Sequence, residues 1–118
     1  MKKPLLAAAF SLISLFAFSP LALAHAVLVA STPSIQSTVN GPALAIDLKF
    51  NSRVDGVRSR LTLVLPTGQT QLLALIKQPA PQELAARAEL TPGAYKLRWQ
   101  AVAADGHITR GEIPFTVK

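Results

Sequence analysis

The segment GAYKLRWQA, residues 93–101, alternates large apolar side chains with basic or polar ones. In an extended chain Tyr95, Leu97 and Trp99 fall on one side, and the residues between them fall on the other. A period of two is typical of a β-strand that covers a core with one face and meets water with the other. We therefore predict a half-buried strand here, with Tyr95 and Trp99 as core residues.

The same alternation continues on both sides of this segment, and turn-forming residues separate the runs. Pro66-Thr67-Gly68 and Thr91-Pro92-Gly93 are the clearest turns. About seven short strands spaced by turns predict one all-β domain, an antiparallel sandwich or barrel. The strands that we expect span residues 27–30, 43–50, 61–65, 70–77, 84–90, 95–101 and 113–117.

Two segments allow another structure. The alanines and the spacing of Glu83 and Arg87 would also permit a helix over residues 82–90. Pro114 lies inside the last expected strand, where it has no backbone N–H to donate. We therefore expect an edge position or a bulge at Pro114.

The first 24 residues follow a different pattern. Two lysines precede an apolar run over residues 5–18, and Ala22-Leu23-Ala24 is a small-residue cleavage sequence. This order predicts a secretory signal peptide over residues 1–24 that is removed after Ala24. The apolar run is shorter than the roughly 18–20 residues that a membrane-spanning helix needs. We therefore expect residues 25–118 to form one exported domain without stable membrane insertion.

Composition excludes several kinds of chemistry. The chain has no cysteine, and its one methionine is Met1, which would leave with the signal peptide. The exported domain would contain no sulfur, which excludes disulfides, cysteine catalysis and thiolate metal sites. Loss of the two N-terminal lysines would lower the net charge from +6 to +4. Because no aromatic residues are interleaved with Arg53, Arg58 and Arg60, we interpret these arginines as a solvated edge and expect no nucleic-acid partner.

His25 would become the first residue after cleavage, and its chemistry would change. A free N-terminal histidine offers its α-amine and its ring Nδ1 together, which closes a chelate ring on a metal ion. The amine has an ordinary pKa near 7.7–8.0. A metal ion can displace that proton near neutral pH, so we expect binding at His25 to weaken on acidification.

The second histidine of the chain lies in the motif Asp105-Gly106-His107. In extended backbone two residues at this spacing project from the same side, and Gly106 between them also permits a tight turn. With His25 they would supply three nitrogens and one carboxylate oxygen, a donor set that suits Cu(II) in tetragonal geometry. Cu(I) would prefer sulfur donors, and the exported domain has none.

Other interpretations of these residues stay open at this point. Asp-Gly is a common turn pair, and a histidine beside it is often a solvated loop residue. A metal-free immunoglobulin-like structural module would then explain the chain. A copper enzyme of the polysaccharide-cleaving kind, which also uses an N-terminal histidine, is the enzymatic alternative. It would need an open coordination position and a broad substrate surface.

Six elements together resemble the CopC family of periplasmic copper-binding proteins. They are His25, Ser31-Thr32-Pro33, Tyr95-Lys96-Leu97-Arg98-Trp99, Asp105-Gly106-His107, Gly111 and Phe115-Thr116-Val117. The resemblance implies a Greek-key, immunoglobulin-like β-sandwich that binds one Cu(II) ion through the amine and side chain of His25, Asp105 and His107. It also implies a monomeric, non-enzymatic role in copper resistance and homeostasis, with an inner-membrane copper transporter of the CopD type as a partner.

The chain departs from the family pattern in two places. Some members carry a methionine-rich loop that binds Cu(I), and this chain has none. Many members have an acidic residue shortly after the Phe of the LKF motif, whereas Asn51-Ser52-Arg53 follows Phe50 here. We therefore expect a Cu(II)-only protein without an additional carboxylate ligand from that position.

Overall fold

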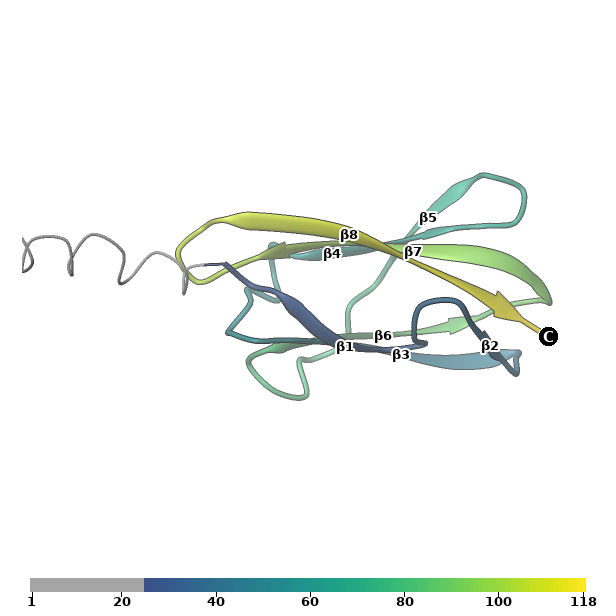
Figure 1. Cartoon of the computed structure of the whole chain (residues 1–118), viewed down its shortest axis with the longest axis horizontal. Coiled ribbons are helices and arrows are strands. Elements are labelled where there is room, and N and C mark those ends of the chain that lie inside the picture. Colours follow the sequence, from purple (N-terminus) through teal and green to yellow (C-terminus); the bar gives the residue numbers. More distant parts are fainter. Residues whose placement is uncertain (1–24) are drawn as a thin grey trace, which may run out of the picture.

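Eight strands form two sheets that face each other across an apolar core, as the computed structural model shows (Figure 1). The structure describes residues 25–118, so the expected signal peptide over residues 1–24 lies outside it. The strands are β1 (Leu28–Thr32), β2 (Ser37–Val39), β3 (Ala43–Phe50), β4 (Arg60–Val64), β5 (Thr70–Leu73), β6 (Glu83–Glu89), β7 (Gly93–Val102) and β8 (Ile108–Val117).

One sheet has three strands in the order β1-β3-β6, and the other has five in the order β2-β8-β7-β4-β5. Neighbouring strands pair antiparallel, except that β2 pairs parallel with β8. The chain changes sheet between β1 and β2, β2 and β3, β3 and β4, β5 and β6, and β6 and β7, so only β4-β5 and β7-β8 are consecutive strands within one sheet. This arrangement confirms the predicted all-β sandwich. Within residues 25–118 no helix is suited to span a bilayer.

The core forms where the alternating runs place their apolar side chains. Leu48 of β3 and Leu97 of β7 are fully buried, and Tyr95 is almost so. The Tyr95 hydroxyl donates to the carbonyl oxygen of Thr91 at 2.7 Å, which satisfies its one polar group. Trp99 is partly buried and packs edge-to-face on Phe50, with ring centroids 5.3 Å apart. The prediction that the tyrosine and the tryptophan are core residues is confirmed.

Several predicted boundaries are wrong. The helix alternative over residues 82–90 is wrong, because β6 pairs with β3 and buries Leu84 and Ala86. The arm expected to reach residue 77 ends at Leu73. A short strand, β2, was not predicted at all. β8 begins at Ile108 rather than at residue 113, since its first half pairs with β7 although it lacks a regular apolar alternation.

Pro114 occupies a position that tolerates a missing N–H. It pairs with Lys96 of β7, and its carbonyl oxygen accepts a hydrogen bond from the backbone N–H of Gln36 at 2.7 Å. The N–H and C=O of a strand residue point to the same side, so the missing donor faces β2 rather than β7. Among the described residues β2 pairs with β8 only from Phe115 onward. β8 lies between β2 and β7, so Pro114 is not on an edge strand, and it lies directly before the residues of β8 that pair with β2.

Candidate metal centre

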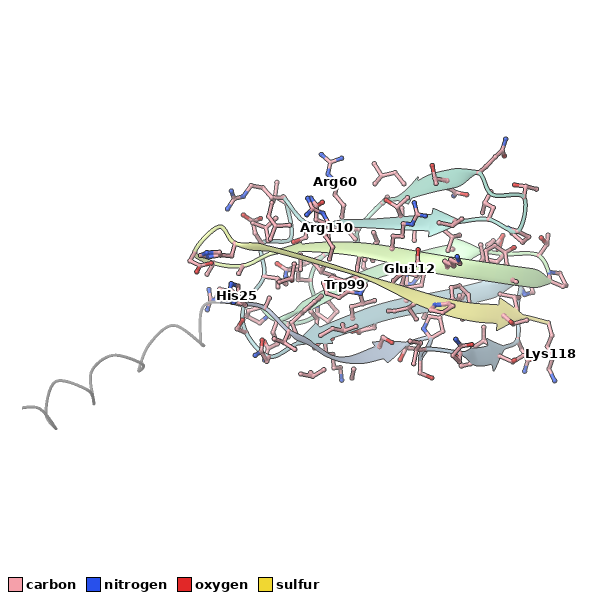
Figure 2. All side chains as sticks on the ribbon, turned by 45° about the horizontal axis from the view of Figure 1, so that its top comes forward. His25, Arg60, Trp99, Arg110, Glu112 and Lys118 are labelled. Atoms are coloured by element: carbon pink, nitrogen blue, oxygen red, sulfur yellow. The ribbon has the colours of Figure 1, made fainter. Side chains whose placement is uncertain are left out.

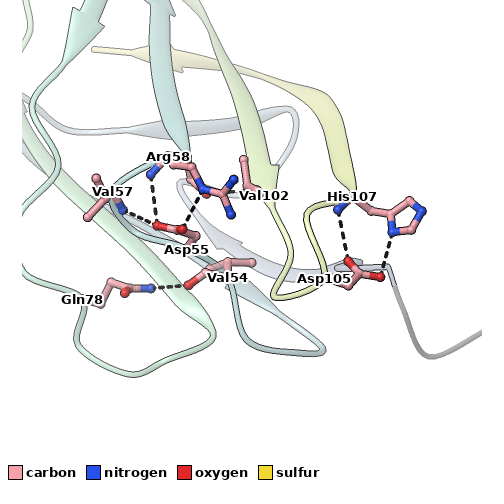
Figure 3. Close-up of polar contacts among 9 residues, drawn as sticks. Val54, Asp55, Val57, Arg58, Gln78, Val102, Asp105 and His107 are labelled. Carbon is pink, nitrogen blue, oxygen red and sulfur yellow. Dashed lines mark hydrogen bonds and ion pairs between the residues drawn. The ribbon is translucent and has the colours of Figure 1, made fainter.

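The two histidines of the chain lie side by side at one end of the sandwich. His25 precedes β1 (Figure 2), and His107 follows the turn between β7 and β8 (Figure 3). Their ring centroids are 4.9 Å apart, and the ring planes are nearly perpendicular at 80°. The fold thus joins two residues that are far apart in the sequence.

A tight turn presents His107, and this differs in part from the sequence-based expectation. The backbone N–H of Gly106 donates to the Ala103 carbonyl oxygen at 2.9 Å, and the N–H of Ala103 donates to the His107 carbonyl oxygen at 2.8 Å. Gly106 has a φ of +93°, which residues with a Cβ rarely adopt. Asp105 and His107 therefore approach through a turn, and the argument from extended backbone is wrong. The role expected for Gly106 in a tight turn is confirmed.

Asp105 orients the imidazole of His107 (Figure 3). Its Oδ2 lies 2.7 Å from His107 Nδ1, and its Oδ1 accepts from the backbone N–H of His107 at 3.1 Å. The backbone hydrogen bond from His107, followed by the ring contact, lowers the pKa of Asp105 below its ordinary value. An ionised carboxylate can only accept, so Nδ1 is the donor, and in the neutral imidazole the free lone pair is then on Nε2. A carboxylate on one ring nitrogen is a common arrangement for a histidine that ligates metal through the other.

The pair is accessible to a dissolved ion. The side chains of His107 and Asp105 are 58% and 39% exposed, and His25 is also exposed. Within the described part of the chain, however, no three His, Cys, Asp or Glu side chains are grouped closely enough to hold a metal. The Asp105 carboxylate is turned onto His107. The α-nitrogen of His25 is a peptide nitrogen in the 118-residue chain. The ligand role of the three residues stays a prediction.

The base of the turn is tied to the connection between β3 and β4. The backbone N–H of Val102 donates to the hydroxyl of Ser59 at 3.0 Å, and the backbone N–H of Asp55 donates to the Val102 carbonyl oxygen at 2.8 Å. Val54 and Ala103 form an isolated antiparallel bridge one residue further along. These contacts restrain the last residues of β7, and they thereby fix where the turn that carries Asp105 and His107 begins.

The segment that leads into β1 is held by residues that sequence reasoning missed. The Asn51 side-chain oxygen accepts from the Val27 N–H at 2.8 Å, and the Asn51 N–H donates to the Val27 carbonyl oxygen at 2.9 Å. The Thr109 hydroxyl donates to the Ala26 carbonyl oxygen at 2.9 Å. Ala26 is fully buried in the core. No local signal in the sequence identifies these contacts, because each joins distant segments.

The family-level comparison agrees with this architecture. The model of the CopC domain matches residues 28–118. The chain belongs to the CopC family. The match covers the described structure from the first residue of β1 to the C-terminal lysine, so both sheets belong to the family domain.

Relatives of the CopC family resemble the chain in sequence and in structure. Copper resistance protein C of Pseudomonas syringae pv. tomato is 33% identical over 121 residues, which span 92% of this chain and 95% of that protein. Copper resistance protein C of Xanthomonas campestris pv. juglandis is 31% identical, over 82% and 83% of the two chains. The crystal structure of CopC from Methylosinus trichosporium OB3b superposes with a TM-score of 0.71 at 31% identity, over 80% of this chain and 94% of that one.

A methionine-rich relative marks one difference within the family. The structure of PcoC from Escherichia coli, described as a methionine-rich copper resistance protein, superposes with a TM-score of 0.65 at 29% identity. It covers 80% of this chain and all of that one. The only methionine of this chain is Met1, so its CopC domain has no thioether sulfur.

Proposed function

We propose that this chain is a periplasmic Cu(II)-binding protein that sequesters or carries copper and contributes to copper resistance and homeostasis. Two of its CopC relatives are copper resistance proteins by name. The observation that carries the proposal is the place of His25 beside His107, with ring centroids 4.9 Å apart. Removal of a signal peptide after Ala24 would give this histidine a free α-amine next to a second imidazole.

In this proposal one Cu(II) ion is bound by His25, Asp105 and His107. His25 contributes its α-amine and its ring Nδ1, and His107 contributes Nε2, because its Nδ1 faces Asp105. Each oxygen of the Asp105 carboxylate has more than one lone pair, so the group can accept from His107 and also bind the ion. Nitrogen and oxygen donors without sulfur favour Cu(II) over Cu(I). The amine must lose a proton to bind, so the affinity should fall as the pH drops below about 7.

The proposed role is binding rather than catalysis. An amine, two imidazoles and a carboxylate would occupy the four equatorial positions of a tetragonal Cu(II) ion and leave little room for a substrate. The protein would act as a monomer and would pass copper to an inner-membrane transporter of the CopD type, as the family resemblance implies. Reductant-driven formation of hydrogen peroxide by the copper-loaded protein would instead support an oxidative enzyme.

The decisive experiment compares two versions of the exported domain. One begins at His25, and the other carries a single additional alanine ahead of it. Both are titrated with Cu(II) while the fluorescence of Trp99 and the electron paramagnetic resonance spectrum are recorded. We expect the additional residue to weaken binding by orders of magnitude and to leave the circular dichroism spectrum unchanged. Equal affinities would contradict the proposal.

Substitutions test the other two ligands in the version that begins at His25. His107→Ala and Asp105→Asn should each weaken Cu(II) binding and change the spectrum, because each removes one equatorial donor. Glu89→Gln is the matched control, since Glu89 is an exposed carboxylate near Lys118, at the other end of the sandwich from His25. Unchanged binding in both site variants would remove Asp105 and His107 from the copper site.

A further inference from the structure

We propose that Asn51 and Thr109 are positioning residues that hold the amino end of the processed protein for copper. This inference rests on the proposed function and extends it to residues that do not touch the ion. The two side chains reach the same dipeptide, Ala26-Val27, from opposite sheets. Together they fix the backbone that carries His25.

Asn51 extends the β1–β3 ladder by one residue in the direction of His25. β1 and β3 pair as far as Leu28 and Phe50. Beyond that pair the backbone N–H of Asn51 donates to the Val27 carbonyl oxygen, and its side-chain oxygen accepts from the Val27 N–H. Both polar backbone groups of Val27 are therefore bound to one residue. Val27 cannot move away from the end of β3 unless both hydrogen bonds break.

Thr109 makes the connection to the other sheet. Its hydroxyl donates to the carbonyl oxygen of Ala26 at 2.9 Å, across 83 positions of sequence. Thr109 lies on β8 two residues after His107. The Thr109 side chain thus links β8, which follows His107, to the peptide that follows His25. This contact restrains the distance between the backbones of the two histidines.

Ala26 completes the restraint by packing. It is fully buried and belongs to the apolar core, although it is only the second residue of the expected exported domain. Three contacts hold the peptide between Ala26 and Val27: the Ala26 side chain packs in the core, Thr109 donates to the Ala26 carbonyl oxygen, and Asn51 accepts from the Val27 N–H. Only the backbone and side-chain torsions of His25 itself then remain to be ordered when a metal ion binds.

Asn51 supplies this restraint without adding charge beside the metal. Its amide offers the same acceptor oxygen to the Val27 N–H as a carboxylate would. A carboxylate there would add a negative charge next to the segment that carries His25. The neutral amide of Asn51 therefore positions the segment that carries His25, and Asp105 stays the single carboxylate of the proposed copper site.

Substitution of each residue tests the proposal in the protein that begins at His25. Thr109→Val keeps the shape of the side chain but removes the hydroxyl, and Asn51→Ala removes the acceptor. Each should weaken Cu(II) binding by about 10–100-fold, the usual effect of losing a group that orients a ligand. The electron paramagnetic resonance spectrum should also change, because the chelating His25 would no longer be held beside Asp105 and His107.

Three further variants separate positioning from general stability. Thr109→Ser restores a hydroxyl and should recover most of the affinity. Thr116→Val removes an exposed threonine from the far end of β8, and Asn40→Ala removes an exposed asparagine remote from the site. These two controls should bind copper like the unsubstituted protein. If Thr109→Val and Asn51→Ala also bind like it, with the same spectrum, the proposal is wrong.

A copper-free measurement keeps this inference distinct from the proposed function. The ¹⁵N heteronuclear Overhauser effects of the Ala26 and Val27 amides should show an ordered backbone in the unsubstituted protein and a mobile one in Thr109→Val and Asn51→Ala. Rigid amides in both variants would overturn the positioning role even if copper binds. Absence of His25-dependent copper binding in the unsubstituted protein would instead overturn the proposed function, and the amide measurement would still decide whether the two side chains anchor this segment.

Discussion

Gly106 shows how one residue without a side chain shapes the candidate site. Its φ of +93° reverses the chain between Asp105 and His107, and the two side chains then meet on one side of the turn. A Cβ at this position would meet no atom within 4 Å, so only the backbone conformation opposes a larger residue. The identity of this residue therefore affects the geometry of the site through torsional strain alone.

Replacing Gly106 should affect both stability and copper binding. Gly106→Ala should lower the free energy of unfolding by about 1–3 kcal/mol, the usual cost of placing a side chain in this region of backbone space. It should also change the Cu(II) spectrum, because the turn would shift Asp105 relative to His107. Urea denaturation and electron paramagnetic resonance measure the two effects.

Gly68 provides the control for this substitution. It has the same φ of +93° and an equally open environment, in the turn between β4 and β5. Gly68→Ala should therefore lose a similar amount of stability and leave the copper spectrum unchanged. A copper spectrum unchanged in both variants would show that the turn tolerates the strain without moving its ligands.

The hydrogen bonds of Asp55, which is not one of the proposed ligands, should make the stability of the fold depend on pH. The hydrogen bond from the Arg58 side chain, followed by the backbone N–H groups of Arg58 and Val57, lowers its pKa below the ordinary 3.8. A lowered pKa means that the folded state favours the ionised form, so this stabilisation is present at neutral pH and is lost as the pH falls through the folded-state pKa. Asp55→Asn should therefore be less stable than the unsubstituted protein at pH 7, and the difference should shrink at about pH 2.5. Urea unfolding at the two pH values tests this, and a difference that persists in acid would contradict it.

At the scale of the secondary-structure elements, the β7–β8 hairpin connects the core to the site. Its ladder runs from Gly93 opposite Val117 to Val102 opposite Ile108, directly beneath the turn with both Asp105 and His107. Trp99 lies opposite Gly111 within this ladder, and its indole passes over the glycine. The absence of a Cβ at Gly111 lets the indole approach the backbone and cover this part of the strand.

Gly111→Ala should displace the indole. The new Cβ would overlap the Trp99 ring, and three of its atoms would be too close for contact. We expect a loss of about 1–3 kcal/mol in the free energy of unfolding, as for other overpacked sites, and a shift of the Trp99 emission maximum to longer wavelength as the ring becomes more exposed. An unchanged emission spectrum would mean that the ladder, rather than the ring, adjusts.

The sequence predicts these elements where the pattern is local. β3 and β7 alternate apolar and polar residues along their own length, so neighbouring positions are enough to identify them. The first half of β8 could not be identified in this way, because Thr109, Arg110 and Gly111 give no apolar alternation, and Gly111 is covered by the indole of Trp99 from the neighbouring strand. β2 has three residues and depends on β8 for all its pairing.

The candidate site was predictable only in part for the same reason. A cleavage pattern and two histidines mark it in the sequence. The residues that hold it, Asn51 and Thr109, find their partners 24 and 83 positions away. Hydrogen bonds over such distances depend on how the two sheets come together, and no local pattern encodes that.

At the scale of the whole molecule, most of the core lies away from the site, and Ala26 is a core residue directly next to a proposed ligand. Fully buried leucines lie between the sheets, whereas the proposed ligands lie on an exposed turn and at the start of the chain. The chain has no disulfide to support the fold, so apolar packing supplies its stability. A substitution of one of these leucines should therefore affect stability without changing the copper site.

Leu97→Ala tests this separation. Leu97 is fully buried on β7, and truncating it should lower the free energy of unfolding by about 2–5 kcal/mol. Under conditions where the variant is still folded by circular dichroism, its Cu(II) affinity and spectrum should match those of the unsubstituted protein. A change in the spectrum would show that strain in the core reaches the turn.

The two ends of the described chain lie at opposite ends of the sandwich, with His25 at one and Lys118 at the other (Figure 2). An affinity tag, a fluorophore or a surface linker on the lysine would sit remote from the histidines. Anything fused ahead of His25 would abolish the amine that the proposed copper chemistry requires. A sensor that is immobilised through the carboxyl end of the protein would therefore present the histidines to the solution. An amino-terminal purification tag, by contrast, should give a folded protein whose affinity for Cu(II) is lower by orders of magnitude.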